Sequence, residues 1–157
     1  NIVLAARQAA DLSAANVVVI PTRNAAEGIA ALLSWDPSLT LEELVPRMEA
    51  ARAAARTFRV VEAVRDAVVR GVSVKAGQIM ALDPVDGIIA TGSTDVESIV
   101  AALAGQTAEL ITLYVGADVS EEQAAEFVSA VRGAIAGVEV DLQHGGQPIE
   151  RVLVSLE

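Results

Sequence analysis

Residues 110–142 read LITLYVGADVSEEQAAEFVSAVRGAIAGVEVDL, and this stretch decides the fold. Its apolar start, 110–115, predicts a buried strand. Ser120 and Gln123 form a capping-box pair, which predicts an amphipathic helix that runs to about residue 135. The inward side of that helix carries Phe127, Val131 and Ile135. Residues 138–142 return to a strand pattern, so strand, helix and strand in succession indicate a partly parallel sheet with helical cover.

The N-terminal third of the chain adds helices and one further expected strand. Helical periodicity predicts three helices, at residues 2–12, 24–34 and 41–55. Thr40 and Glu43 form a capping box at the start of the third helix, which contains Pro46. The run Asn16–Ile20 is apolar and β-branched after its first residue. We therefore expect a strand here, buried on both faces.

Between residues 57 and 93 the hydrophobic period changes from helical to two, and glycine-containing turns divide the segment. This pattern predicts an antiparallel meander with short strands at 58–64, 68–69, 72–74, 79–82 and 88–91. A helix capped by Thr94 and Glu97 follows, and Val152–Leu156 is the last strand. We predict a mixed α/β (α+β) fold: alternating helix and strand layers at 1–56 and 94–157, with the meander at 57–93 as a separate insertion.

Charge and composition exclude several classes of protein. Lys and Arg total 11 against 21 for Asp and Glu, and the resulting net charge of −10 opposes general binding to nucleic acid or to an anionic membrane. No apolar run reaches the ~18 residues of a membrane span. Cysteine is absent, which excludes thiolate catalysis and disulfides. With no cysteine, and with no basic region before an apolar stretch at the N-terminus, we expect a cytoplasmic protein without a signal peptide. Because the chain begins without Met and inside an expected helix, we expect it to be a fragment of a longer protein.

The segment between the expected strand at 16–20 and the next helix is a candidate anion site. A hydroxyl, a guanidinium and the free N–H groups of a helix start lie close together here, a combination that holds phosphate or carboxylate. An alternative is an N-capped helix with Arg23 in solvent. Neither a P-loop nor a dinucleotide-binding glycine motif is present. The candidate residues are Pro21, Thr22, Arg23, Asn24, Glu27 and Gly28.

A second candidate is the loop between the last two strands, formed by Gly145, Gly146, Gln147 and Pro148. The two glycines allow a sharp bend and Pro148 restricts the exit, so the loop is either a shaped contact surface or a tight hairpin with a bulge. His144 has no neighbouring nucleophile, so we expect no catalytic role for it. The acidic residues Asp118, Glu121 and Glu122 fit the start of a helix better than a cation site.

Four strings in order resemble a known family. They are VVVIPTRN with GIAALL, VRD with the glycine-rich turns that follow, ITLYVG with DVSEEQA, and GGQP with the final Glu157. Together they are similar to the C-terminal domain of the dihydroxyacetone-kinase-like (DAK-phosphatase-like) proteins, the ATP-binding subunits of bacterial fatty-acid kinase. The resemblance covers essentially all 157 residues.

The resemblance implies a division of labour within a longer protein. An absent N-terminal kinase domain binds ATP and magnesium, a central domain connects it to this one, and the product is an acyl-phosphate. The partner is a DegV-type fatty-acid-binding protein, which this domain docks without binding a cofactor of its own. The expected contacts are the two candidate loops, and a homodimer is a further expected assembly. The rival hypothesis is a small anion- or phosphate-binding enzyme module built on Thr22, Arg23 and Asn24.

We expect the purified chain alone not to hydrolyse ATP or to transfer its phosphate, because the sequence offers no phosphate-binding loop and no cluster of metal-binding carboxylates. Magnesium-dependent phosphate release is the measurement. Turnover that a point substitution within residues 1–157 abolishes would contradict this expectation.

Overall fold

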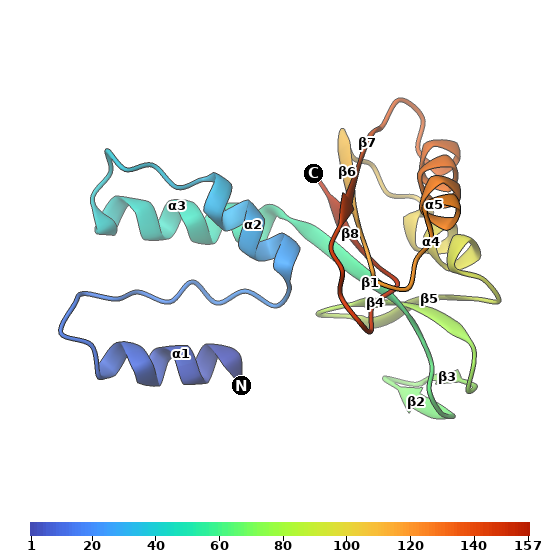
Figure 1. Ribbon diagram of the computed structural model, residues 1–157, viewed down its shortest axis with the longest axis horizontal. Helices are drawn as coiled ribbons and strands as arrows, with labels where there is room; N and C mark the ends of the chain where they lie inside the picture. The colour runs from blue at the N-terminus through green and yellow to red at the C-terminus, as the bar shows by residue number, and fades with distance from the viewer. The chain divides into compact units, whose positions relative to one another are not determined.

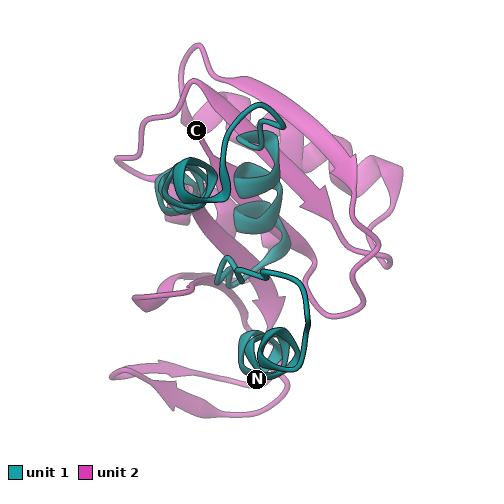
Figure 2. Ribbon diagram, turned by 90° about the vertical axis from the view of Figure 1, so that its left-hand side faces the viewer, with its two compact units in different colours: residues 1–55 teal, residues 56–157 magenta.

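The computed structural model describes all residues, 1–157, and divides the chain into two compact units. Unit 1 is Asn1–Ala55 and unit 2 is Arg56–Glu157 (Figure 2). Helices alone make up the regular structure of unit 1, and both sheets belong to unit 2. No helix in the chain has the length and hydrophobicity that a membrane crossing requires.

Unit 1 contains three helices, α1 (Ile2–Asp11), α2 (Ala25–Leu33) and α3 (Leu41–Ala54). The capping box at the start of α3 is confirmed, since Thr40 and Glu43 each accept a hydrogen bond from the other's backbone N–H. The helix begins at Leu41 and includes Pro46. Helices α2 and α3 pack against each other.

The strand expected at 16–20 is wrong. These residues connect α1 to α2 without strand structure, and Val17 and Val18 are exposed. High β-propensity produces a strand only where a neighbouring strand takes up the backbone hydrogen bonds, and unit 1 has no strand. The alternating helix and strand pattern expected for residues 1–56 is therefore not present.

Unit 2 is built on a six-stranded sheet with the order β5-β4-β1-β8-β6-β7 (Figure 1). Its strands are β1 (Arg56–Glu62), β4 (Ile79–Asp83), β5 (Gly87–Gly92), β6 (Leu110–Val115), β7 (Glu139–His144) and β8 (Val152–Leu156). The pair β6 and β7 is parallel, which confirms the expected partly parallel sheet, and the other pairs are antiparallel. The meander is not a separate insertion, because β1 pairs with β8 and brings β4 and β5 into this sheet.

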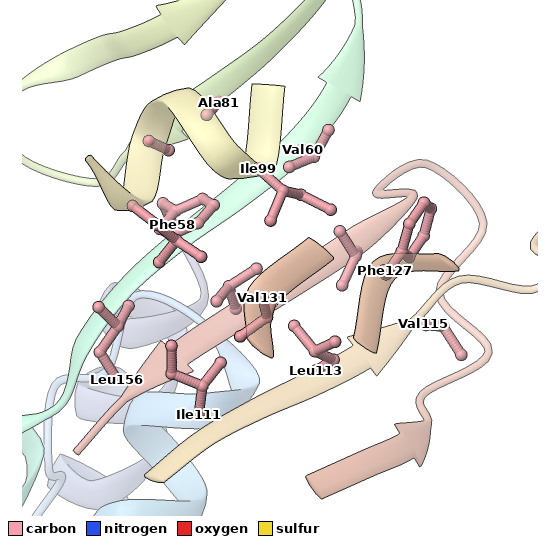
Figure 3. Packing of buried hydrophobic residues seen from close by; sticks show 14 of the residues in the cluster. Phe58, Val60, Ala81, Ile99, Ile111, Leu113, Val115, Phe127, Val131 and Leu156 are labelled. Atoms are coloured by element: carbon pink, nitrogen blue, oxygen red, sulfur yellow. The ribbon is translucent and has the colours of Figure 1, made fainter. Parts of the chain in front are cut away.

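Helices α4 (Asp95–Leu103) and α5 (Glu121–Ala134) cover one face of the sheet (Figure 1). The core lies between the helices and that face, with alternate residues of the central strands pointing into it (Figure 3). The predicted inward residues Phe127, Val131 and Ile135 are all buried in it, because residues three and four positions apart share one face of a helix.

A short hairpin of β2 (Ala67–Val69) and β3 (Val72–Val74) forms a second sheet. Arg70 and Gly71 make the two-residue turn, with φ of 49° and 87°, as a type I′ turn requires. The inner face of the hairpin joins a second core cluster, whose buried members are Ala63, Val74 and Ile88.

The core predicts a contrast between two valines on helices. Val131 on α5 is 0% exposed and Val100 on α4 is 39% exposed. Val131→Ala should lower the free energy of unfolding by about 1 to 3 kcal/mol, because it removes buried methyl groups and leaves a cavity. Val100→Ala should change it by less than about 0.5 kcal/mol. Urea unfolding followed by circular dichroism measures both, and equal losses would contradict the assigned core.

Candidate functional site

The first candidate segment forms a polar cluster at the start of α2. The side chain of Asn24 accepts a hydrogen bond from the N–H of Glu27 (3.0 Å), so Asn24 is the predicted cap. The carboxylate of Glu27 turns back and accepts the N–H of Arg23 (2.8 Å). Glu27 is only 2% exposed. A buried carboxylate therefore lies at the helix start, where its charge is favourable to the helix dipole.

Two arginines face this carboxylate. The guanidinium groups of Arg23 and Arg52 each lie 3.7 Å from an oxygen of Glu27. Arg52 comes from α3, so the cluster also joins the two packed helices. An anion bound at this helix start would meet the carboxylate of Glu27 among the same N–H and guanidinium groups. The arrangement thus serves first as an internal ion-pair cluster.

The remaining residues of this segment lie beside the cluster. Pro21 and Thr22 are partly buried, and a Cβ at Gly28 would lie 3.9 Å from Oγ1 of Thr22, an ordinary contact. Arg52 is the member that sequence reasoning missed. It follows Arg23 by 29 positions, and only the packing of α2 on α3 brings it to Glu27.

The second candidate loop is tied to the end of β6. The side-chain amide of Gln147 donates a hydrogen bond to the carbonyl oxygen of Tyr114 (2.7 Å). The N–H groups of Gly145 and Gly146 both donate to the carbonyl oxygen of Val115 (3.0 and 3.1 Å). These bonds hold the backbone of the loop in one shape and turn the Gln147 side chain toward the sheet.

Glycine is favoured at three places in this arrangement, for different reasons. A Cβ on Gly116 would collide with the backbone carbonyl oxygen of Glu150. A Cβ on Gly145 would meet Oε1 of Gln147, so the side chain of Gln147 would have to move. Gly146 has a φ of 67°, a left-handed conformation that side chains disfavour.

The outer side of the loop is apolar, and its end is anchored by charge. Pro148 is exposed and Ile149 is 76% exposed. Arg151 follows, and its Nε lies 2.7 Å from both carboxylate oxygens of Asp95 on α4. The sequence analysis missed all three of Ile149, Arg151 and Asp95. The available signal in the sequence was an isoleucine directly after the GGQP loop.

The other polar residues considered from the sequence take no part in the side-chain contacts that anchor the β7–β8 loop. His144 is exposed at the end of β7, opposite Val115 in the parallel register. Glu121 and Glu122 occupy the first turn of α5, as expected for residues that complement the helix dipole. No group of three or more His, Cys, Asp or Glu side chains is placed to hold a metal ion.

Comparison with known protein families gives a match along the whole chain. Residues 1–157 match the family of FakA-like C-terminal domains of fatty acid kinase. The chain belongs to this family. The resemblance inferred from the four sequence strings is thereby confirmed.

Curated relatives of this FakA-like domain are uncharacterized staphylococcal proteins. Those of Staphylococcus haemolyticus and Staphylococcus saprophyticus are 35% and 32% identical to it over 161 residues, and that of Staphylococcus aureus is 31% identical over 160. Each match covers 100% of this chain and 29% of the relative. The chain therefore spans less than a third of the curated relatives it matches.

A solved structure with some likeness to this domain is the fatty acid kinase (Fak) B3 protein of Streptococcus pneumoniae, loaded with linoleic acid. The TM-score is 0.47 at 15% identity, and the alignment covers 76% of this chain and 50% of that one. A likeness at this level supports no conclusion about the fold or function of this domain.

The ion-pair cluster around Glu27 predicts different changes in stability for substitution of Arg23 and for substitution of Glu27. Arg23→Ala should change the free energy of unfolding by less than about 0.5 kcal/mol, because Arg23 is half exposed and Glu27 keeps Arg52 as a partner. Glu27→Ala should lower it by about 1 to 3 kcal/mol, because a part-buried Arg52 and the backbone N–H of Arg23 lose their acceptor. Thermal unfolding measures both. A fall of several degrees in Tm for Arg23→Ala, with binding intact, would show that Arg23 is structural instead.

Proposed function

We propose that this chain is the docking domain of a FakA-like fatty acid kinase protein. In this proposal it binds a DegV-type fatty-acid-binding protein, so that a kinase domain elsewhere in the protein phosphorylates the acyl carboxylate with ATP and magnesium. Membership of the family supports the connection to fatty acid kinase. The relatives' additional length leaves ample room for separate kinase and central domains.

The observation that carries the proposal is the shape of the loop between β7 and β8. Its backbone is held by hydrogen bonds to β6, and its outer side presents Pro148 and Ile149 to solvent. A loop that is already ordered loses little conformational entropy on binding, and an exposed isoleucine gains from burial against a partner. A rigid loop with an apolar tip at the end of a sheet is well suited to recognise another protein.

The loop's residues divide into two roles. The predicted contact residue Gln147 directs its side chain toward Tyr114, so it acts on a partner through the shape of the loop. Gly145 and Gly146 do the same through the backbone. Direct contact falls to Pro148 and to Ile149, which the sequence interpretation did not include.

The alternative of an anion-binding enzyme module on Thr22, Arg23 and Asn24 has less support. The buried carboxylate of Glu27 already accepts the N–H of Arg23 and faces the guanidinium groups of Arg23 and Arg52. A phosphate or carboxylate ligand would have to overcome repulsion from this group. The docking function is consequently the one that the described geometry supports best.

Calorimetric titration of the chain with an acyl-loaded DegV-type protein tests the docking function. We expect saturable binding, and we expect Ile149→Ala to weaken it by more than about 1 kcal/mol, because the apolar tip is lost. Gln147→Ala should weaken binding too, because the loop loses the hydrogen bond from Gln147 to the carbonyl oxygen of Tyr114 and becomes less ordered.

Val100→Ala is the matched control, since it removes an exposed apolar side chain from the surface of α4 and should leave the affinity unchanged. Absence of heat at high micromolar concentrations, with both proteins folded, would rule out docking. An unchanged affinity for Ile149→Ala would remove this loop from the contact.

A further inference from the structure

The hairpin of β2 and β3 presents one large apolar side chain, that of Val68, on its outer face. Val68 and Ser73 pair across the hairpin, on the side opposite to the one that joins the second core cluster. Val68 is 70% exposed, and Val64, which precedes the hairpin, is 92% exposed. Nothing within unit 2 covers these valines, although the hairpin's other face is packed.

Two cations without ion pairs stand beside these valines. Arg65 and Arg70 are exposed and make no ion pair. The cations of unit 2 that are paired with carboxylates are Arg59, Lys75 and Arg151. In a chain of net charge −10, this surface combines two arginines that make no ion pair with exposed apolar area. Such a patch favours a partner face that is both acidic and apolar.

The hairpin is held in place at its base. Lys75 lies 2.8 Å from Asp66, and the N–H of Ala76 donates to the same carboxylate (2.9 Å). The hydrogen bonds from Lys75 and Ala76 lower the pKa of Asp66, so the carboxylate is charged at neutral pH. The N–H of Gly77 also donates to the carbonyl oxygen of Ala63 (2.7 Å).

A packing contact also holds the tip of the hairpin in position. Arg70 is the one non-glycine residue with positive φ, and its aliphatic stem lies over Gly87, where an added Cβ would be 3.2 Å from its Cδ. A left-handed conformation is less favourable for arginine than for glycine or asparagine, the residues usual at such a turn. The packing of its stem accounts for the position of the side chain, but the turn itself does not require an arginine.

The hairpin and the β7–β8 loop leave the same end of the sheet. Val60 of β1 is paired with Val152 of β8, and the N–H of Arg151 donates to the carbonyl oxygen of Val60 (2.9 Å). The chain reaches Val64 shortly after Val60, and it reaches Val152 shortly after Ile149. Figure 1 shows both segments at this end. The two most exposed apolar side chains of unit 2, Val64 and Ile149, thus flank one pair of neighbouring strands.

We propose that residues 64–76, which comprise the hairpin and the residues on either side of it, form one docking surface together with the tip of the β7–β8 loop. This surface binds an acidic, partly apolar face of the fatty-acid-binding partner. This inference rests on the proposed function and adds the chemistry of the partner's face. Carboxylates of the partner pair with Arg65 and Arg70, and apolar side chains cover Val64, Val68 and Ile149. Charge attraction orients the two proteins, and burial of the apolar side chains holds them together.

The test is the same calorimetric titration with acyl-loaded DegV-type protein, carried out at low and at high salt. We expect Arg65→Glu to weaken binding about tenfold or more at low salt, because it places a carboxylate against carboxylates. Arg65→Glu combined with Arg70→Asn should weaken it further and should flatten the salt dependence. Asparagine is chosen because it adopts the left-handed turn conformation readily, so the hairpin keeps its shape.

Arg132→Glu is the matched control. Arg132 is another exposed cation without an ion pair, it lies on α5, and its reversal changes the net charge by the same amount. It should leave the affinity within about twofold. Thermal unfolding of each variant establishes that it is folded.

Three results would overturn the inference. Equal weakening by Arg65→Glu and Arg132→Glu would show a general charge effect. Unchanged affinity and salt dependence for the Arg65 variants, with the unsubstituted chain binding, would show that the partner does not use the hairpin, although docking would stand. Failure of the unsubstituted chain to bind at either salt concentration would overturn the docking function and this inference together.

Discussion

The architecture of unit 2 depends on the hydrogen bonding of β8 along both of its edges. This last strand, Val152–Leu156, pairs antiparallel with β1 on one side and with β6 on the other, and all five of its residues are buried. Without it, the strands of residues 56–92 and those of residues 110–144 would be separate three- and two-stranded pieces. Such small pieces rarely bury enough apolar surface to be stable alone. The core beneath α4 and α5 is continuous because β8 makes the sheet continuous.

The start of β8 also determines where the candidate docking surface lies. Arg151 donates its N–H to Val60, accepts the N–H of Gly116 (2.9 Å), and pairs its guanidinium with Asp95. One residue therefore connects β1, the end of β6 and α4 at the point where the β7–β8 loop rejoins the sheet. The loop's apolar tip and the β2–β3 hairpin extend from this junction, so their placement follows from backbone pairing in the sheet.

Unit 1 combines apolar packing of α2 on α3 with a buried polar cluster. Glu27 is buried at the start of α2 and faces Arg52 from α3, so a charge cluster accompanies the packing of two short helices. Removing one partner from such a cluster leaves a buried charged group without an opposite charge. Buried carboxylates of this kind are therefore found with partners. The cluster gives the conspicuous Thr22, Arg23 and Asn24 motif a structural explanation.

The sequence by itself determined the features that depend on neighbours along the chain. The capping boxes of Thr40 with Glu43 and of Ser120 with Gln123 mark helix starts, while period-two runs within residues 57–93 and the apolar run at 110–115 mark strands of unit 2. Only the tertiary structure decided that residues 16–20 form no strand, that β1 pairs with β8, and that Ile149 faces solvent while Gln147 turns inward. A cap needs partners three residues away, but strand pairing and side-chain exposure depend on groups that are distant in sequence, and no local pattern specifies which of them will meet.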